Sequence, residues 1–475
     1  MTLLRKAKSD ILFSNSVFIF LTRFFPVLAV LLVQVYYSRH LAQHVYGSYQ
    51  NFWVQLYVFA AIACAGAHVF IVTYPPAFLI RLVFRADSKY FYYFFSWLLL
   101  VCLVFAFMQL NKGYSLWLPF IFLLIHSVSA IAESMLIVFK KLRQLALVNF
   151  IYALAFAYLH YASLSNGLDL QDIFTYVLVL MFMKLVSYLA SAYSYMLIHK
   201  KEALSEELYT AGVGSLWLHM GLYDFLNILS RWVDKFVVSL LLAESISGIY
   251  FNGAVDIPFI PLIVGAAGSA TLIQLASKED KSEPAYTVAL ANRTSRLLSA
   301  VVFPLFFFFV LFRHELFDVV FTSKFSEAVP IFLASCLMIP LRAYSFTTVL
   351  QNRNRGAIIN TGAVIDLALA FALIYPLYQL LGLVGIALSF SLATYVQAGF
   401  YLYHTSKILG VPVLTLFPYK NWLAKLTVFG SLFTATHYLF SLYLSAKLSL
   451  SLGFVIAALT ILISISLELR RAAKQ

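Results

Sequence analysis

The stretch LAQHVYGSYQN at residues 41–51 has a counterpart, LAESISGIYFN, at residues 242–252. Both follow the pattern L-A-x4-G-x-Y-x-N, and each lies at an expected turn between two long apolar stretches. Glycine permits a tight turn, and tyrosine suits the interface between water and lipid. The alternative explanation is that two unrelated turns match by chance. The equal placement of the two stretches instead favours a duplication, with two similar halves of six spans each.

The composition is that of a membrane protein. Of 475 residues, 62% are hydrophobic and 11% are charged, whereas soluble domains have about 45–50% apolar and about 25% charged residues. The mean hydropathy is +0.88. These values exclude a soluble globular enzyme, a disordered chain and a secreted disulfide scaffold. All three cysteines fall inside apolar runs, so we expect buried thiols and neither a disulfide framework nor a metal site: Cys64, Cys102 and Cys336.

A membrane-spanning helix needs about 20 largely apolar residues. The first apolar run is too long for a signal peptide and is interpreted as a retained span. Stretches 212–242 and 247–273 are unusually long, which predicts tilt, kinks or interfacial ends. The sequence predicts fourteen spans, at 14–37, 48–72, 89–109, 116–139, 144–164, 173–198, 212–242, 247–273, 296–314, 328–350, 357–378, 382–406, 422–443 and 448–467.

The basic residues predict the orientation. The net charge is +13, which taken alone would suggest nucleic-acid binding. Of the 33 lysines and arginines, however, 23 lie in segments on the side of the N-terminus and 5 on the other side. Such segments are typically cytoplasmic, so we expect both termini in the cytoplasm of a membrane protein that does not bind nucleic acid. The short loops leave no room for a soluble domain.

The predicted fold class is therefore an all-α polytopic membrane protein. Two parallel six-helix lobes at residues 1–200 and 201–410 would surround a central cavity, and residues 411–475 would add two helices and a cytoplasmic tail. Rocking of one lobe against the other would open the cavity to each side in turn.

Ionisable residues inside the spans are candidate functional residues, because a charge at the bilayer centre costs at least about 2.5 kcal/mol. The cations are Arg23, Lys184, Arg231, Lys235 and Arg342, and the anions are Glu133, Asp224, Asp234, Asp256 and Asp366.

The seventh span carries five polar residues on one helix face, at spacings i, i+3, i+7, i+10 and i+11. Such a face either holds helices together through ion pairs or forms the charged wall of a cavity. An i, i+3 pair of Arg231 and Asp234 would partly neutralise itself. The five residues are Asp224, Asn227, Arg231, Asp234 and Lys235.

The cations suit a phosphorylated substrate, since arginine binds phosphate through a bidentate fork and lysine binds it as a point charge. Arg23 and Arg231 occupy equivalent spans and are expected on opposite walls of one cavity. For Arg342, contact of its side chain with lipid headgroups is the alternative.

The carboxylates are candidates for ion coupling. Asp256 precedes Pro258 and Pro261, which predict a kinked helix with freed carbonyl groups. Asp366 and Glu133 either carry a coupling proton or pair with Lys184 or Arg342. Four histidines are expected to be structural or interfacial, namely His126, His160, His219 and His437.

Several segments resemble the oligosaccharide-lipid flippases of the multidrug/oligosaccharidyl-lipid/polysaccharide (MOP) exporter superfamily. They are SRWVDK at 230–235, LLLA at 240–243, GIY at 248–250, FKK at 139–141 and GLVGIA at 382–387. The resemblance implies transport of undecaprenyl-pyrophosphate-linked sugar repeats, with Arg23, Arg231 and Lys235 holding the anionic carrier lipid and a Na⁺ or H⁺ gradient driving the cycle. A polysaccharide polymerase and glycosyltransferases would be partners.

Two other functions are open at this stage. A cation-coupled exporter of drugs or small molecules would share the fold. A glycan polymerase or ligase would need a long outer loop with catalytic residues, and the short loops disfavour it. The sequence contains no HExxH, Walker A, GxSxG or CxxC motif, so we expect a transporter without a cofactor.

Overall fold

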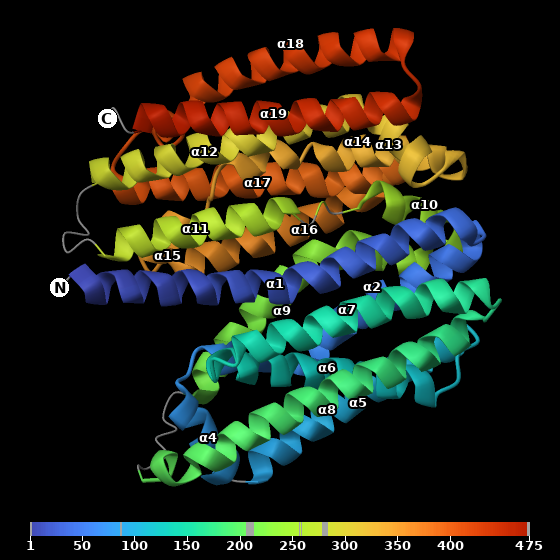
Figure 1. Cartoon of the computed structure of the whole chain (residues 1–475), viewed down its shortest axis with the longest axis vertical. Helices are drawn as coiled ribbons and strands as arrows, with labels where there is room; N and C mark the ends of the chain where they lie inside the picture. The colour runs from blue at the N-terminus through green and yellow to red at the C-terminus, as the bar shows by residue number, and fades with distance from the viewer. Residues whose placement is uncertain are drawn as a thin grey trace. The chain divides into compact units, whose positions relative to one another are not determined.

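The computed structural model is helical throughout the part of the chain that it describes (Figure 1). That part comprises residues 2–85, 88–205, 213–255, 257, 259–277 and 284–472, and it contains no strand. Ten segments within it are long and apolar enough to cross a membrane. The predicted fold class, an all-α polytopic membrane protein, is confirmed.

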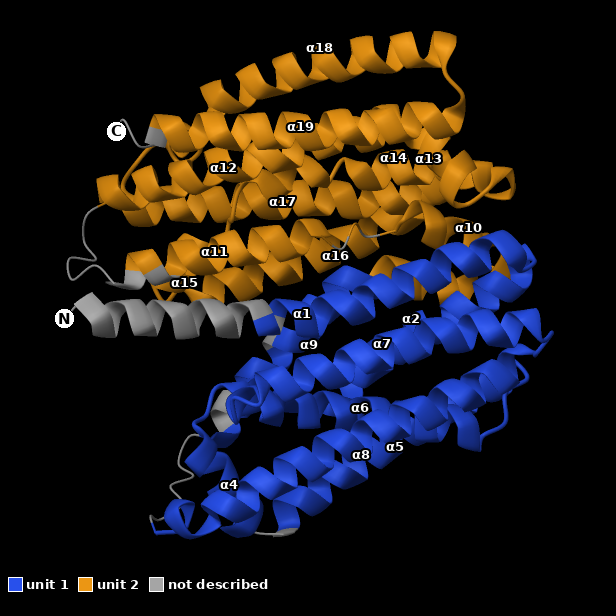
Figure 2. Ribbon diagram, in the orientation of Figure 1, with its two compact units in different colours: residues 1–232 blue, residues 233–475 orange. Residues whose placement is uncertain are grey.

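The chain divides into two compact units, residues 1–232 and 233–475 (Figure 2). The helix α9 (Val213–Leu241) is continuous and contributes its first part to unit 1 and its last part to unit 2. The other helices of unit 1 are α1 (Thr2–His40), α2 (Gln43–Cys64), α3 (Ala67–Val72), α4 (Pro76–Arg85), α5 (Ser88–Leu110), α6 (Trp117–Val138), α7 (Leu142–Ser165) and α8 (Leu170–Ala203).

The described residues of unit 2 form the remaining α-helices and three short 3-10 helices. In chain order they are α10 (Glu244–Gly253), α11 (Phe259–Ser277), α12 (Pro284–Leu311), α13 (Arg313–Val320), η1 (Ser323–Ala328), α14 (Val329–Cys336), η2 (Ile339–Ala343), α15 (Thr348–Asn352), α16 (Gly356–Leu381), α17 (Leu383–Leu409), η3 (Val413–Thr415), α18 (Tyr419–Tyr443) and α19 (Ala446–Ala472).

Three of the fourteen predicted spans are broken into shorter helices. The stretch 48–72 becomes α2 and α3, and 247–273 becomes α10 and α11. The stretch 328–350 becomes α14, η2 and α15, because Pro330 and Pro340 each stand in the first turn of a new helix. Proline has no N–H to continue the preceding helix but suits a first turn. The sequence predicts a kink only in the second of these stretches, and the other two breaks were not predicted.

The break between α2 and α3 fixes the first part of α9 against unit 1. Ala65 and Gly66 have positive φ angles of 45° and 73°. A Cβ atom at Gly66 would lie 2.2 Å from the Cα of Gly221 on α9, so two glycines allow the backbones to touch. The indole N–H of Trp217 donates to the carbonyl oxygen of Ala65 at 2.8 Å. Residues 213–232 therefore pack with unit 1, although the sequence analysis assigned them to the second lobe.

The helix α4 was not predicted and packs against α8. Its last residue, Arg85, donates a 2.6 Å hydrogen bond to the carbonyl oxygen of Leu204, just beyond α8. Lys200 lies with its ammonium nitrogen 4.4 Å from the ring centre of Phe84. The basic segment after the second span is thus folded as a short helix.

The two copies of the repeated motif adopt the same local structure. Ala42 and Ala243 precede α2 and α10 with nearly identical backbone angles, φ −63° and ψ 150° against φ −61° and ψ 150°. Gly47 and Gly248 are buried inside these helices, so the expectation that they form the turns is wrong. The matching geometry supports a duplicated structural element.

The motif tyrosines are also placed differently from expectation. Tyr49 and Tyr250 are buried, with exposed fractions of 4% and 0%, so they do not lie at a lipid interface. The hydroxyl group of Tyr49 lies 3.0 Å from the Nε2 atom of His160, and that of Tyr250 donates to the Oδ2 atom of Asp234 at 3.0 Å. Each tyrosine instead joins a buried polar contact within its own unit, which satisfies the hydroxyl group.

Candidate substrate and ion site

A cavity of about 190 Å³ lies inside unit 1, between five helices. We call it the unit 1 cavity. Helices α1, α2, α6, α7 and α8 all contribute to its wall, which combines aromatic rings with ionisable side chains. The lining residues are Pro26, Ala29, Val30, Trp53, Tyr57, His126, Ser129, Ala130, Glu133, Tyr152, Phe156, Met181 and Lys184.

Two of the predicted site residues, Lys184 and Glu133, share this cavity. The ammonium nitrogen of Lys184 lies 4.6 Å from the ring centre of Tyr152 and 5.2 Å from that of Tyr188. In the described part of the chain, no carboxylate comes within ion-pair distance of Lys184. The cavity therefore holds a lysine and a glutamate that do not form an ion pair with each other. Both lie in surroundings where charge is poorly solvated.

Helical spacing explains why these residues face one space. On α6, His126, Ser129, Ala130 and Glu133 follow i, i+3, i+4 and i+7, which places them on one face. Pro26 contributes the wall from α1. Arg23 lies one turn earlier on that helix, where its side chain is exposed and is not part of the lining.

The first three residues of the predicted polar face on α9 belong to unit 1. Asp224 accepts a contact from His68, with the Nε2 and Oδ2 atoms 3.3 Å apart. Asn227 and Arg231 have exposed side chains. His68 was not singled out from the sequence, because it is one lone histidine in an apolar stretch and only the break at Gly66 brings it to α9.

The last two residues of this face are buried in unit 2. Lys235 has its Nζ atom 3.6 Å from the Oδ2 atom of Asp234, and Tyr250 donates to the same oxygen. Both charged residues are less than a tenth exposed. This arrangement favours the ion-pair interpretation for Asp234 and Lys235.

The remaining candidates lie elsewhere. Asp366 on α16 is buried and accepts a 3.3 Å hydrogen bond from the hydroxyl group of Thr394. Arg342 lies in η2 with an exposed side chain. Asp256 falls outside the described residues.

Most of the cysteines and histidines behave as expected. Cys64, Cys102 and Cys336 are free and buried. His160 lies in a buried cluster of aromatic rings, and the Nε2 atom of His437 lies 2.8 Å from Glu315. His126 is the exception, because it lines the unit 1 cavity.

The comparisons with known proteins bear on the fold. The profile of a family described as "Polysaccharide biosynthesis protein" matches residues 212–330. No curated protein sequence matches the chain.

Two of the solved structures that match cover most of the chain. The lipid II flippase MurJ in an inward closed conformation matches with a TM-score of 0.62 and 16% identity, over 96% of this chain and 99% of that one. An inward-facing multidrug resistance MATE family transporter of the MOP superfamily matches with a TM-score of 0.50 and 12% identity, over 81% and 94%. The resemblance inferred from the sequence is confirmed at the level of the fold, which this multi-pass membrane protein shares with both of these proteins.

Proposed function

We propose that this protein is a flippase that moves undecaprenyl-pyrophosphate-linked oligosaccharide repeat units across the bacterial inner membrane. It would work by alternating access, with an ion gradient as the energy source. The match of residues 212–330 to a polysaccharide biosynthesis family supports the substrate class, and the similarity to a lipid II flippase supports a fold suited to lipid-linked substrates.

The observation that carries the proposal is the unit 1 cavity with Lys184 on its wall. A pyrophosphate group must leave water to cross the bilayer, and a fixed cation in a cavity replaces part of its hydration. Lysine is suited to this role because it binds phosphate as a point charge from several directions. The pyrophosphate would enter at Lys184, while Arg23 and Arg231, both exposed on unit 1, would extend the cationic surface.

Glu133 supplies a route to ion coupling in the same cavity. An ionised Glu133 attracts Lys184 and competes with the pyrophosphate for it. Protonation of Glu133, or binding of Na⁺ to it, removes that competition and strengthens the hold of Lys184 on the anion. Substrate affinity and ion occupancy are then linked by one pair of side chains, as reciprocal coupling requires. Asp224, Asp234 and Asp366 already have partners within the protein, which makes Glu133 the preferred coupling group.

The test uses a strain lacking this protein, complemented with variants that reach the membrane in equal amounts. Lys184→Ala should abolish surface polysaccharide and cause lipid-linked repeat units to accumulate, whereas Lys184→Arg should retain partial activity. Lys141→Ala is the matched control, because Lys141 also lies over an aromatic ring, 5.8 Å from the centre of Tyr195, but outside the cavity. Normal polysaccharide in the Lys184→Ala strain would refute the proposed role.

A second candidate function is the export of cationic drugs or other small molecules. Glu133 shares its cavity with the aromatic side chains of Trp53, Tyr57 and Tyr152, a combination that also suits an organic cation. Drug resistance that is lost in Glu133→Gln, in a strain whose surface polysaccharide is unaffected by deletion of the protein, would favour this function over the first.

A further inference from the structure

A second pocket, of about 170 Å³, lies in unit 2 between the first part of α12 and the last part of α19. We call it the α12–α19 pocket. Its lining residues are Ala289, Asn292, Arg293, Arg296, Leu297, Glu468 and Arg471. On α12, residues 289, 292, 293 and 296 share one helix face. Among the described residues, three arginines and a single carboxylate thus surround one small space.

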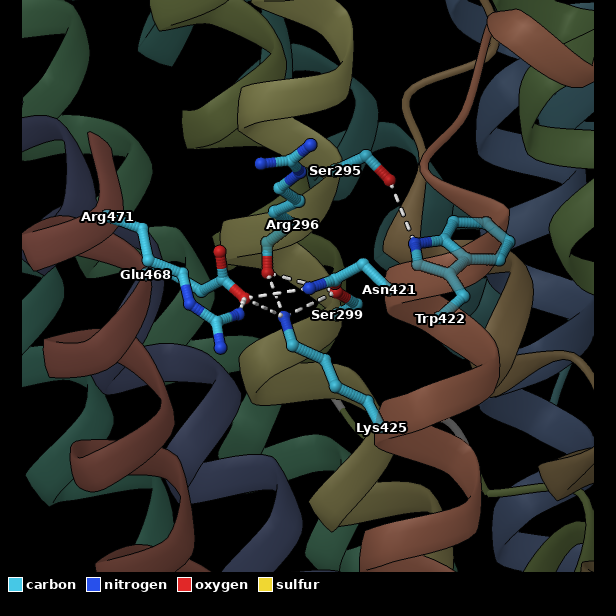
Figure 3. A network of polar contacts seen from close by, with 8 residues as sticks. All are labelled: Ser295, Arg296, Ser299, Asn421, Trp422, Lys425, Glu468 and Arg471. Atoms are coloured by element: carbon cyan, nitrogen blue, oxygen red, sulfur yellow. Dashed lines mark hydrogen bonds and ion pairs between the residues drawn. The ribbon is translucent and has the colours of Figure 1, made fainter. Parts of the chain in front are cut away.

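The carboxylate is already occupied by other partners. Lys425 of α18 lies with its Nζ atom 3.0 Å from the Oε1 atom of Glu468, and Asn421 donates to the same oxygen at 3.0 Å (Figure 3). Lys425 is buried in α18. Because Glu468 is neutralised by Lys425, the arginines of the pocket are left with excess positive charge.

The guanidinium group of Arg296 is not directed at this ion pair (Figure 3). Lys425 donates to the backbone carbonyl oxygen of Arg296 at 2.6 Å, while the guanidinium group of Arg296 points away from Lys425 (Figure 3). Within the described chain, the Nε atom of Arg296 is buried and has no hydrogen-bond partner. Arg471 reaches Glu468 only at 3.6 Å, and its side chain is 63% exposed. A buried N–H without a partner is costly, and a bound acceptor would satisfy it.

We propose that the α12–α19 pocket binds the phosphate group of an anionic phospholipid headgroup. Guanidinium groups pair with phosphate oxygens through two parallel hydrogen bonds. The pocket lies at the end of unit 2 where Arg293, Arg296, Arg470 and Arg471 gather, which the distribution of basic residues predicts to be cytoplasmic. Basic pockets between membrane helices on that side are suited to anionic lipid headgroups. The site is separate from the unit 1 cavity and does not depend on the proposed transport function.

The test measures binding of phosphatidylglycerol to the full-length protein in neutral detergent micelles by native mass spectrometry. The double variant Arg293→Gln/Arg296→Gln should bind at least about tenfold more weakly than the unaltered protein, because charge-assisted hydrogen bonds are lost. Arg471→Gln should also weaken binding, and this single variant tests the site if the double variant folds poorly. Arg470→Gln is the matched control, since Arg470 adjoins Arg471 but does not line the pocket.

Two further titrations identify the ligand source. Phosphatidylcholine, whose headgroup carries no net charge, should bind without dependence on these arginines. If inorganic phosphate binds through the same arginines and phosphatidylglycerol does not, the ligand is a soluble phosphate compound and the proposal of a lipid ligand is overturned. Equal phosphatidylglycerol binding by all variants, or none by the unaltered protein, would overturn the site.

Discussion

The buried pair of Lys425 and Glu468 offers a quantitative test of the packing of α18 and α19 onto α12. Lys425 holds Glu468 at 3.0 Å and also donates to the hydroxyl group of Ser299 at 3.0 Å. Their residues are only 8% and 5% exposed. At an effective dielectric constant of about 20, two charges at this distance attract each other by about 5.5 kcal/mol, most of which offsets the cost of removing them from water.

Replacing Lys425 with methionine should therefore lower the free energy of unfolding by far more than the small net contribution of the ion pair. The variant leaves a buried carboxylate without its main partner, which typically costs about 3–5 kcal/mol. Arg471 still lies 3.6 Å from Glu468, but as an exposed side chain it restores no more than about 1 kcal/mol. We expect Lys425→Met to lower the free energy of unfolding by about 3 kcal/mol.

The assay is unfolding in mixed micelles titrated with sodium dodecyl sulfate and followed by circular dichroism. The double variant Lys425→Met/Glu468→Gln removes both charges and should recover at least about half of the loss, because the uncompensated charge is gone. A loss below about 0.5 kcal/mol in the single variant, or a double variant less stable than the single one, would refute the reasoning.

Two further predictions concern the close helix contact and the repeated motif. Gly66→Ala should destabilise the protein by about 3 kcal/mol, because the alanine would have a positive φ and would also clash with α9. Gly113→Ala should cost about 1 kcal/mol, because Gly113 has a positive φ but open space around it. Equal losses of stability on thermal unfolding would contradict the contact. Tyr250→Phe removes a hydrogen bond to buried Asp234 and should cost about 2 kcal/mol; an unchanged unfolding midpoint would mean that this hydroxyl group contributes nothing to the stability of unit 2.

Most of the predicted spans correspond to single long helices, because a long apolar run is evident from composition alone. The breaks at Ala65 and Gly66 were missed for a physical reason. Apolar residues such as those around them fit a continuous helix equally well, and only the approach of Gly221 from 155 residues away makes the bend favourable. The backbone conformation at that point is therefore determined by a tertiary contact.

The candidate site was likewise predicted from the sequence only in part. Lys184 and Glu133 were identified because charged residues inside spans are rare and costly. Their shared cavity was not foreseen, since the sequence shows which residues share a helix face but not which faces meet. The burial of Lys425 was missed because a lysine near the end of a span is normally solvated, and its partner Glu468 lies on another helix.

The most direct test of the account is the affinity of the purified full-length protein for undecaprenyl pyrophosphate, with Lys184→Ala compared against Lys141→Ala. If Lys184 holds the pyrophosphate group, its removal should weaken binding by roughly 10- to 150-fold, as expected for the loss of a charge-assisted hydrogen bond, while the control binds as the unaltered protein does. Equal affinity of all three proteins would contradict the claim that the unit 1 cavity receives the lipid headgroup.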